Sequence, residues 1–409
     1  MAERTAATAA ATTAAATTAA AAGAPSGLLP VLSGNMILDA LEVSIVLLAL
    51  PVVGADLHAS LWTVQWLMSG FALGFAAMLL PGPALAARWG RRRTYLAALL
   101  VFALASLVGG LGNGIVVLVA ARVVKGGCAA LTAPAGLAVI STAYPQGARQ
   151  RRAVSTYSMF GAAGFTCGLV LSVLLLRAGW RWVFLFPAPV ALVLLGLAWA
   201  AVPRDEAAAA PRITLSVLRH GALARSAIGA ATLNGAYVSL LVLVSARLDA
   251  HGWPAWRIAL GLLPACVPLM VCVPFAAGLV ARFGTARLVA AGAVATFAGE
   301  LLALARGLPG AYLDTTLPVL LLVEAGFVLS FAALNMQAVS AVPAALRPVA
   351  VPVYQTAVQL GGVIMLPLVT ALASGHAGRR PLLAVAAAGL VGVAAALGGR
   401  RPDPREAPS

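Results

Sequence analysis

The sequence has few charged residues and almost no lysine. Only 10% of its 409 residues are charged, against about 25% in a typical soluble domain. Lys125 is the one lysine. Hydrophobic residues, by contrast, make up 62% of the chain. A soluble core cannot bury this much apolar surface, so we expect much of it to face lipid.

Cysteine and histidine are also scarce, with four residues of each type. The cysteines lie inside apolar runs without metal-ligand spacing, and the histidines are scattered in expected loops. The sequence contains no His-Glu-x-x-His motif and no Gly-x-x-x-x-Gly-Lys-Ser/Thr loop. It therefore predicts no metal site and no cofactor, and it favours neither a membrane-embedded enzyme nor an ATP-driven pump.

The net charge of +15 comes almost entirely from arginine. These arginines form short clusters between long apolar runs, a pattern typical of loops that set the orientation of a membrane protein. We therefore interpret the basic charge as an orientation signal and predict no nucleic-acid partner.

The sequence contains twelve apolar stretches, and most of them reach the roughly 20 residues that a helix needs to cross a bilayer. The alternating pattern of a membrane β-barrel is absent. The sequence therefore predicts an all-α integral membrane protein. The stretches are Leu28–Val53, Leu61–Ala87, Thr94–Leu111, Ile115–Ala143, Ala153–Leu176, Trp182–Val202, Ala227–Leu248, Arg257–Ala281, Leu288–Ala305, Thr316–Val342, Val349–Ala373 and Leu382–Leu397.

The arginines predict the orientation of these helices. With an even number of spans, both termini share one side, and the tails and loops of that side hold 18 of the 27 basic residues. The opposite loops hold seven, and the remaining two lie inside the fourth stretch. Cytoplasmic loops carry the excess of basic residues, so we expect both termini in the cytoplasm. The Ala/Arg-rich composition suggests a bacterial plasma (inner) membrane.

The longest polar gap divides the twelve stretches into two sets of six. We expect a low-complexity cytoplasmic tail at residues 1–27, a six-helix bundle at 28–202, a cytoplasmic linker at 203–226, a second bundle at 227–399 and a short tail at 400–409. The halves repeat the pattern Leu-x-Ala-Arg-aromatic-Gly-x-x-Arg, at Leu85–Arg93 and Leu279–Arg287. Parallel repeats of this kind place a substrate site between the halves near the bilayer midplane.

Five short motifs follow one another along the chain, each in a different predicted helix or the loop beside it. They are Leu41–Pro51, Leu85–Arg93, Arg122–Gly126, Trp180–Phe184 and Gln359–Gly362. In this set the chain resembles the major facilitator superfamily, and within it the drug:proton antiporter branch. The resemblance implies two pseudo-symmetric six-helix halves, a small-molecule substrate, protons as a second partner and a functional monomer.

The chain departs from the branch's motifs at several positions. Ala87 stands where the loop motif has an aspartate, and Lys125 replaces the usual glutamine. Phe165 takes the place of a proline in the fifth helix, and the chain has twelve predicted helices where the branch commonly has fourteen. The resemblance assigns a gating role to the loop residues Arg88, Gly90, Arg91 and Arg92.

Two acids and two bases are expected deep in the membrane. Asp39 and Glu42 lie one turn apart in the first helix, and Arg122 and Lys125 have the same spacing in the fourth. Because charge is costly at this depth, such residues normally face a partner or a wet cavity. The resemblance places the two pairs opposite each other as a proton-coupling site, with Glu42 on the signature position. The alternative is a structural salt bridge.

Further polar residues in the expected helices are candidates to line a substrate cavity. Glu324 is a cavity acid or a residue solvated at the mouth, and Glu300 is expected to have a packing or snorkelling role. Interhelical hydrogen bonds are the alternative for the uncharged residues. These are Asn234, Tyr237, Asn335, Gln355, Gln359 and Tyr157.

The first functional hypothesis is a proton-coupled secondary transporter that exports small amphipathic organic molecules by alternating access. The second is an uptake symporter or uniporter of a small metabolite with the same fold. The loss of the proline at Phe165 favours the second hypothesis, whereas the motif around Glu42 favours the first.

The predicted orientation is testable with single cysteines in a chain whose native cysteines have been replaced. Ala377→Cys, in an expected outer loop, should react with a membrane-impermeant thiol reagent in intact cells. Ala208→Cys, in the expected cytoplasmic linker, should react only after the membrane is opened. Labelling of both positions from outside intact cells would contradict the topology.

Overall fold

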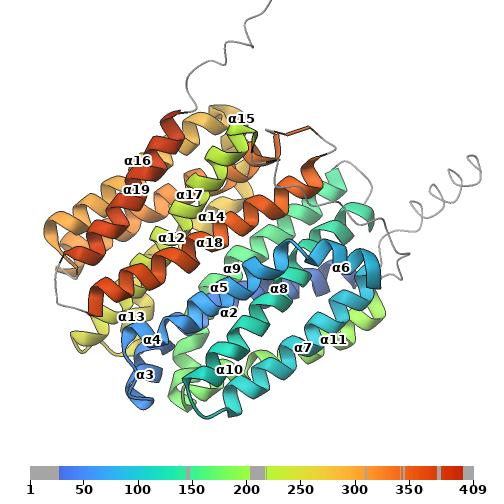
Figure 1. Cartoon of the computed structure of the whole chain (residues 1–409), viewed down its shortest axis with the longest axis horizontal. Coiled ribbons are helices and arrows are strands. Elements are labelled where there is room, and N and C mark those ends of the chain that lie inside the picture. Colours follow the sequence, from blue (N-terminus) through green and yellow to red (C-terminus); the bar gives the residue numbers. More distant parts are fainter. Residues whose placement is uncertain are drawn as a thin grey trace, which may run out of the picture.

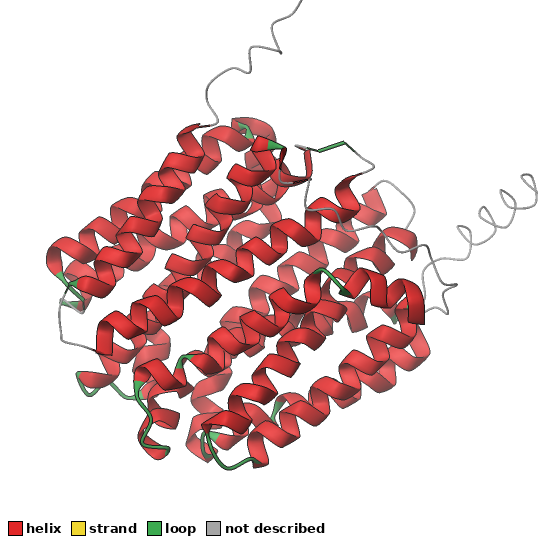
Figure 2. Cartoon of the chain, in the orientation of Figure 1, coloured by secondary structure: helices red, strands yellow, loops and turns green. Residues whose placement is uncertain are grey.

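The computed structural model describes residues 27–143, 148–202, 217, 219–308, 311–340, 342–343, 346–374 and 379–398. Both predicted tails, apart from Gly27, and most of the predicted linker lie outside these ranges. Within them the chain is almost entirely helical and contains no strand, as Figure 2 shows.

Twelve segments of the described residues are long and apolar enough to cross a membrane, and each has 19 to 30 residues. They coincide with the twelve stretches expected from the sequence, which confirms the all-α integral membrane fold. The first six consist of α2 (Leu28–Leu47) with α3 (Ala49–Asp56), α4 (Leu61–Val64) with α5 (Trp66–Leu79), α7 (Arg91–Leu111), α8 (Ile115–Ala143), α9 (Ala148–Ala178), and α10 (Arg181–Leu185) with α11 (Pro187–Ala201). The second six consist of α12 (Gly221–Ala250), α13 (Ala255–Leu262) with α14 (Val267–Cys272) and α15 (Ala276–Phe283), α16 (Thr285–Arg306), α17 (Leu317–Ser340) preceded by the turn η4 (Tyr312–Thr316), α18 (Arg347–Ser374) and α19 (Arg380–Gly398).

The helices form two groups that lie side by side, α2–α11 and α12–α19 (Figure 1). In each group the first membrane helix packs along the fifth, α2 against α9 and α12 against α18. The third packs along the fourth, α7 against α8 and α16 against α17. The same pairing in both groups is the arrangement that a parallel six-helix repeat produces.

The two groups share an apolar core. They meet where α2 contacts α12, where α5 contacts α18, and where α9 contacts α13 and α14. The shared core includes Leu50 from α3 and Leu248 and Leu262 from the second group. Its members from the first group begin at Leu41 and come from the helix halves remote from the start of α2. A separate apolar cluster around Leu32 at the start of α2 has members from the first group alone. The groups are therefore packed together at the end of the molecule where the first membrane helix turns into the second.

A glycine with positive φ joins the second and third membrane helices of each group. Gly90 has φ of 88° between α6 (Gly82–Trp89) and α7, and Gly284 has φ of 78° between α15 and α16. Both occupy the glycine of the repeated motif. A residue with a Cβ atom adopts this conformation only with strain, so the turn itself explains why both copies of the motif contain glycine.

Substitution of this glycine tests the turn. Gly90→Ala should destabilise the folded protein by about 1–2 kcal/mol, because alanine is strained at positive φ. The measurement is thermal unfolding of the purified protein in detergent. Gly196→Ala is the matched control, since a Cβ atom there meets no atom within 4 Å. An equal loss of stability in both variants would contradict the role of the turn.

Candidate functional site

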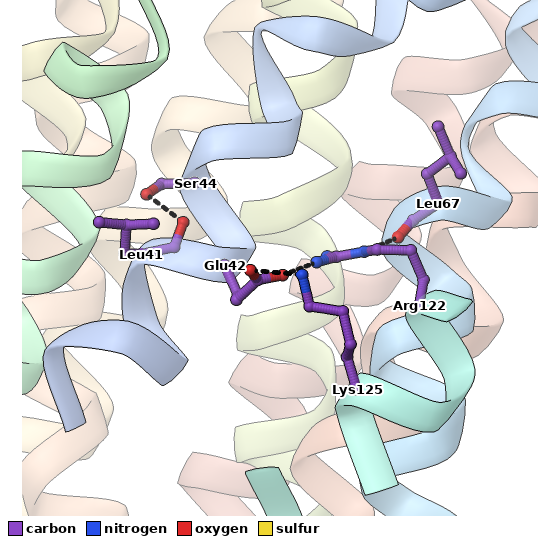
Figure 3. A network of polar contacts seen from close by, with 6 residues as sticks. All are labelled: Leu41, Glu42, Ser44, Leu67, Arg122 and Lys125. Carbon is purple, nitrogen blue, oxygen red and sulfur yellow. Dashed lines mark hydrogen bonds and ion pairs between the residues drawn. The ribbon is translucent and has the colours of Figure 1, made fainter. Parts of the chain in front are cut away.

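Glu42 lies at the centre of a buried cluster of ion pairs. It projects from α2 toward α8, where Arg122 and Lys125 lie one turn apart (Figure 3). Its Oε2 atom pairs with the Arg122 guanidinium, and its Oε1 atom accepts a hydrogen bond from Lys125 Nζ at 2.6 Å. All three side chains are only 1% exposed. The structure thus brings together three of the four residues predicted for proton coupling.

Neighbouring helices hold the two cations in place. Arg122 Nε donates a hydrogen bond to the Leu67 carbonyl oxygen at 2.6 Å, as Figure 3 shows, and the guanidinium lies 4.6 Å from the centre of the Phe71 ring. Lys125 Nζ lies 4.9 Å from the centre of the Phe102 ring. Aromatic faces attract cations strongly when both are removed from water. The cluster therefore connects α2, α5, α7 and α8.

Asp39, the fourth predicted residue, has a different environment. Its Oδ2 atom accepts hydrogen bonds from Asn35 Nδ2 at 2.9 Å and from Thr132 Oγ1 at 3.2 Å. The residue is buried, and within the described part of the chain no cation forms an ion pair with it. Ionised Glu42 is thus balanced by two cations, whereas Asp39 can take up a proton without the loss of an ion pair.

The eighth membrane helix is interrupted by Pro264, Pro268 and Pro274. Two short 3₁₀ turns, Leu263–Ala265 and Val273–Phe275, separate α13, α14 and α15. Proline lacks an N–H group and breaks the ladder of helical hydrogen bonds. Backbone groups freed in this way need other partners inside a membrane.

Glu324 and Tyr237 supply these partners. Glu324, on α17, is fully buried and accepts a hydrogen bond from the Leu269 backbone N–H at 2.9 Å. Tyr237, on α12, donates its hydroxyl hydrogen bond to the Ala265 carbonyl oxygen. In an unbroken helix the Leu269 N–H would bind the Ala265 carbonyl. Two residues predicted to line the cavity therefore bind the backbone groups that the break in the eighth membrane helix leaves free.

Aromatic side chains form a row across the boundary between the two groups. Phe165 of α9 lies 6.5 Å from the ring of Tyr237. The Tyr237 ring lies 4.6 Å from Phe327 of α17, and Phe327 lies 4.9 Å from Phe331, with the distances taken between ring centres. Phe165, which stands where the family motif has a proline, thus belongs to a row of rings that extends from α9 to α12 and α17.

Three of the predicted polar residues of α12, α17 and α18 join these helices to one another. Asn234 Nδ2 donates to the Val358 carbonyl oxygen at 3.0 Å. Gln355 Nε2 donates to Asn335 Oδ1 at 3.2 Å. Gln359 lies half-buried one turn beyond Gln355. These are the interhelical hydrogen bonds that the sequence offered as the alternative to cavity residues.

Tyr157 is buried in the apolar cluster of the first group. Its hydroxyl donates a hydrogen bond to the Ala133 carbonyl oxygen at 2.9 Å. The side chain therefore joins α9 to α8, and its observed contact is again an interhelical hydrogen bond.

The predicted gating residues surround the turn at Gly90. Arg92 donates a hydrogen bond to the Trp199 carbonyl oxygen at 2.5 Å, and its guanidinium lies 5.3 Å from the centre of the Trp199 ring. Arg88 is exposed at the end of α6, and Arg91 begins α7 half-buried. Of the predicted gating residues, Arg92 thus joins two membrane helices of the described chain, α7 and α11.

Sequence reasoning missed several uncharged residues that lie near the predicted site residues. Asn35 lies four residues before Asp39, and Phe327 lies three residues after Glu324. Helical spacing puts each on the same face as its acid, a signal that finds such neighbours. Thr132 and Phe165 lie on other helices, and no local signal connects them to Asp39 or Tyr237.

The buried groups can hold charge and exchange protons, and they can bind a ligand by hydrogen bonds and ring contacts. Among the described residues no group of three or more His, Cys, Asp or Glu side chains is placed to hold a metal ion. The arrangement combines buried carboxyls, cations and aromatic rings.

Fold and site define a multi-pass helical membrane protein with two similar six-helix groups and a charged cluster inside the first group. The sequence matches the model of the Major Facilitator Superfamily over residues 32–366. The chain belongs to this superfamily.

Two curated relatives indicate its closer kinship. The chain is 30% identical over 247 residues to a probable actinorhodin transporter of Streptomyces coelicolor, a match that covers 58% of this chain and 40% of that protein. It is 32% identical over 233 residues to the cephamycin export protein CmcT of Amycolatopsis lactamdurans, a match that covers 57% of this chain and 46% of that protein. The matched part spans less than half the length of either relative.

A solved structure shows the same fold. The nucleoside transporter NupG superposes with a TM-score of 0.72 and covers 91% of this chain and 100% of its own. The two sequences are 14% identical, so the likeness concerns the fold alone.

The ion-pair cluster makes a testable prediction about stability. Glu42→Gln leaves two buried cations without their carboxylate and should cost about 3–5 kcal/mol of stability, the usual effect of removing one partner of a buried pair. Asp39→Asn, which breaks no ion pair, should cost much less. Unfolding of both variants in the same detergent gives the comparison.

A triple variant separates charge from packing. Glu42→Gln combined with Arg122→Met and Lys125→Met removes the unpaired cations and should recover a large part of the stability lost in Glu42→Gln. If the triple variant is less stable than Glu42→Gln, the loss does not arise from unpaired charge.

Proposed function

We propose that this protein is a proton-coupled secondary transporter that exports small amphipathic organic molecules by alternating access. The observation that carries the proposal is the pairing of Glu42 with Arg122 and Lys125 inside the first helix group, beside an acid, Asp39, that has no cation of its own. Buried ionisable residues in membrane helices commonly mark proton relays or substrate pathways. The printed names of the curated relatives, a probable transporter and an export protein, support the direction of transport.

The geometry suggests different roles for the two acids. With Glu42 ionised, its cluster with Arg122 and Lys125 carries one net positive charge, and ionised Asp39 brings the local total to zero. A proton on Asp39 would restore the positive charge inside a medium of low dielectric, where charges interact strongly. We therefore assign the exchangeable proton to Asp39 and an anchoring role to Glu42, in place of the sequence-based preference for Glu42.

The packing of the two groups suggests which state the structure represents. They share a core at the end remote from the start of α2, and the arginine pattern predicts that this end faces outward. In our proposal the substrate cavity of this state faces the cytoplasm. Transport then requires the groups to separate at the outer end and meet at the inner end.

The row of aromatic rings suggests the kind of substrate. Phe165 and Tyr237 face each other from the two groups, so a ligand held there would contact both halves. The ring row is apolar, and Glu324 lies one turn from Phe327 on α17. A molecule with an aromatic or apolar body and a polar end fits these residues.

Proton coupling is testable in proteoliposomes. Asp39→Asn keeps the size of the side chain and its hydrogen-bond acceptor but cannot exchange a proton. It should still permit downhill movement of a substrate, here a fluorescent amphipathic dye, and should lose both accumulation against a gradient and substrate-induced proton movement. Glu42→Gln should lose accumulation as well, because its two cations are left without the carboxylate.

The matched control is Asp249→Asn, which changes an exposed acid at the end of α12. It should accumulate the dye and move protons like the parent. If Asp39→Asn and Glu42→Gln both behave like this control, the acids are structural and proton coupling through them is refuted. Dye movement with protons in the same direction would instead establish the uptake alternative.

A further inference from the structure

Glu300 is a buried acid without a partner among the described residues, in a part of the protein that the proposed transport site does not use. It lies on α16 and is 1% exposed. Neither of its carboxylate oxygens has a hydrogen-bond partner among the described residues. An ionised acid at bilayer depth costs about 2.5–3.5 kcal/mol on insertion scales even without further burial. The resting carboxyl is therefore expected to carry a proton.

The carboxyl of Glu300 lines a small hollow between α12, α16, α17 and α19. Three hydroxyl side chains, those of Thr232, Thr296 and Ser330, line the same hollow, and the Thr296 hydroxyl also lacks a partner. A Cβ atom at Gly389 would collide with Glu300 Oε2, so the glycine leaves room for the carboxyl. The rest of the lining is mostly apolar, and the hollow has space for about one water molecule beside these polar groups.

A second hollow adjoins the first and lies toward one end of the bundle. The two share Gly229, Val289 and Leu334 as lining residues. The second hollow is also lined by Arg225, near the start of α12, and by Gln337, near the end of α17. The arginine pattern places this end of both helices on the cytoplasmic side. The two adjoining hollows thus lie between that side and Glu300.

Few charged groups lie on the helices that surround Glu300. Glu324 of α17 is bonded to Leu269 on the eighth membrane helix. Arg225 of α12 lines the far hollow, and the two hollows contain no other charged lining residue within the described chain. The remaining charged residues of α12, α16 and α19 lie near helix ends and are Arg247, Asp249, Arg287, Arg306 and Arg380.

We propose that Glu300 is a proton-binding site of the second helix group, loaded and unloaded from the cytoplasmic side through these two hollows. Each hollow has space for water, and the carboxyl that lines the first has neither an ion-pair partner nor a hydrogen-bond partner among the described residues. Loss of its proton creates a bare charge between four helices, which changes the energy of their packing. The site is separate from Asp39 and Glu42, and it stands whether the protein exports or imports its substrate.

The test uses a hydrophobic carbodiimide, dicyclohexylcarbodiimide, which modifies protonated carboxyls in apolar surroundings. The full chain is studied in right-side-out and inside-out membrane vesicles with the pH of each side set separately. After digestion with trypsin, mass spectrometry follows the adduct on residues 288–306, whose one acid is Glu300. Glu300→Gln is the negative control for this peptide.

Labelling of Glu300 should fall as the cytoplasmic pH rises, by about tenfold per pH unit beyond the titration point. It should not respond to the pH of the outer side. Labelling that is independent of pH on both sides, or that follows the outer side, would overturn the proposal. Saturable protection by sodium ions at constant pH would also overturn it and assign the site to a monovalent cation. The parent protein provides every one of these outcomes, so none depends on the folding of a variant.

Discussion

The bilayer interior offers no water to solvate a charge or a free backbone group, and this constraint governs the structure. Each charge or free backbone group placed there needs a partner within the protein. Glu42 is tolerated because Arg122 and Lys125 bind its two oxygens, and the two cations in turn bind a backbone carbonyl and aromatic faces. The need to satisfy one carboxylate thereby joins four helices of the first group and defines their relative positions.

The same constraint explains the side-chain contacts around the broken helix of the second group. Prolines break its eighth membrane helix, and the freed backbone groups bind Glu324 and Tyr237. Side-chain partners of this kind are easier to exchange than an unbroken helical ladder, since a side chain can rotate away. The break lies beside the ring row that crosses the boundary between the groups. The break in the eighth membrane helix is therefore placed next to the proposed ligand site.

Four buried acids occur in four environments. Glu42 is ion-paired, Asp39 is bound by neutral donors, Glu324 binds a backbone N–H, and Glu300 has no partner within the described chain. Their residue types are nearly alike, so their chemistry differs through their surroundings. An acid held by cations is suited to anchor helices, whereas acids without cations are suited to exchange protons.

Hydropathy by itself determined the twelve membrane helices, because the transfer of a side chain into lipid is a local property of the chain. The sequence also placed Asp39 and Glu42 on one helix face and Arg122 and Lys125 on another, since helical spacing is local too. Tertiary packing alone decided the partners. Arg122 is 80 residues from Glu42 along the chain, yet the two side chains form an ion pair. Asp39 instead accepts a hydrogen bond from Thr132. Which groups meet depends on how whole helices pack, and that is settled by many contacts distant in sequence, which no local pattern contains.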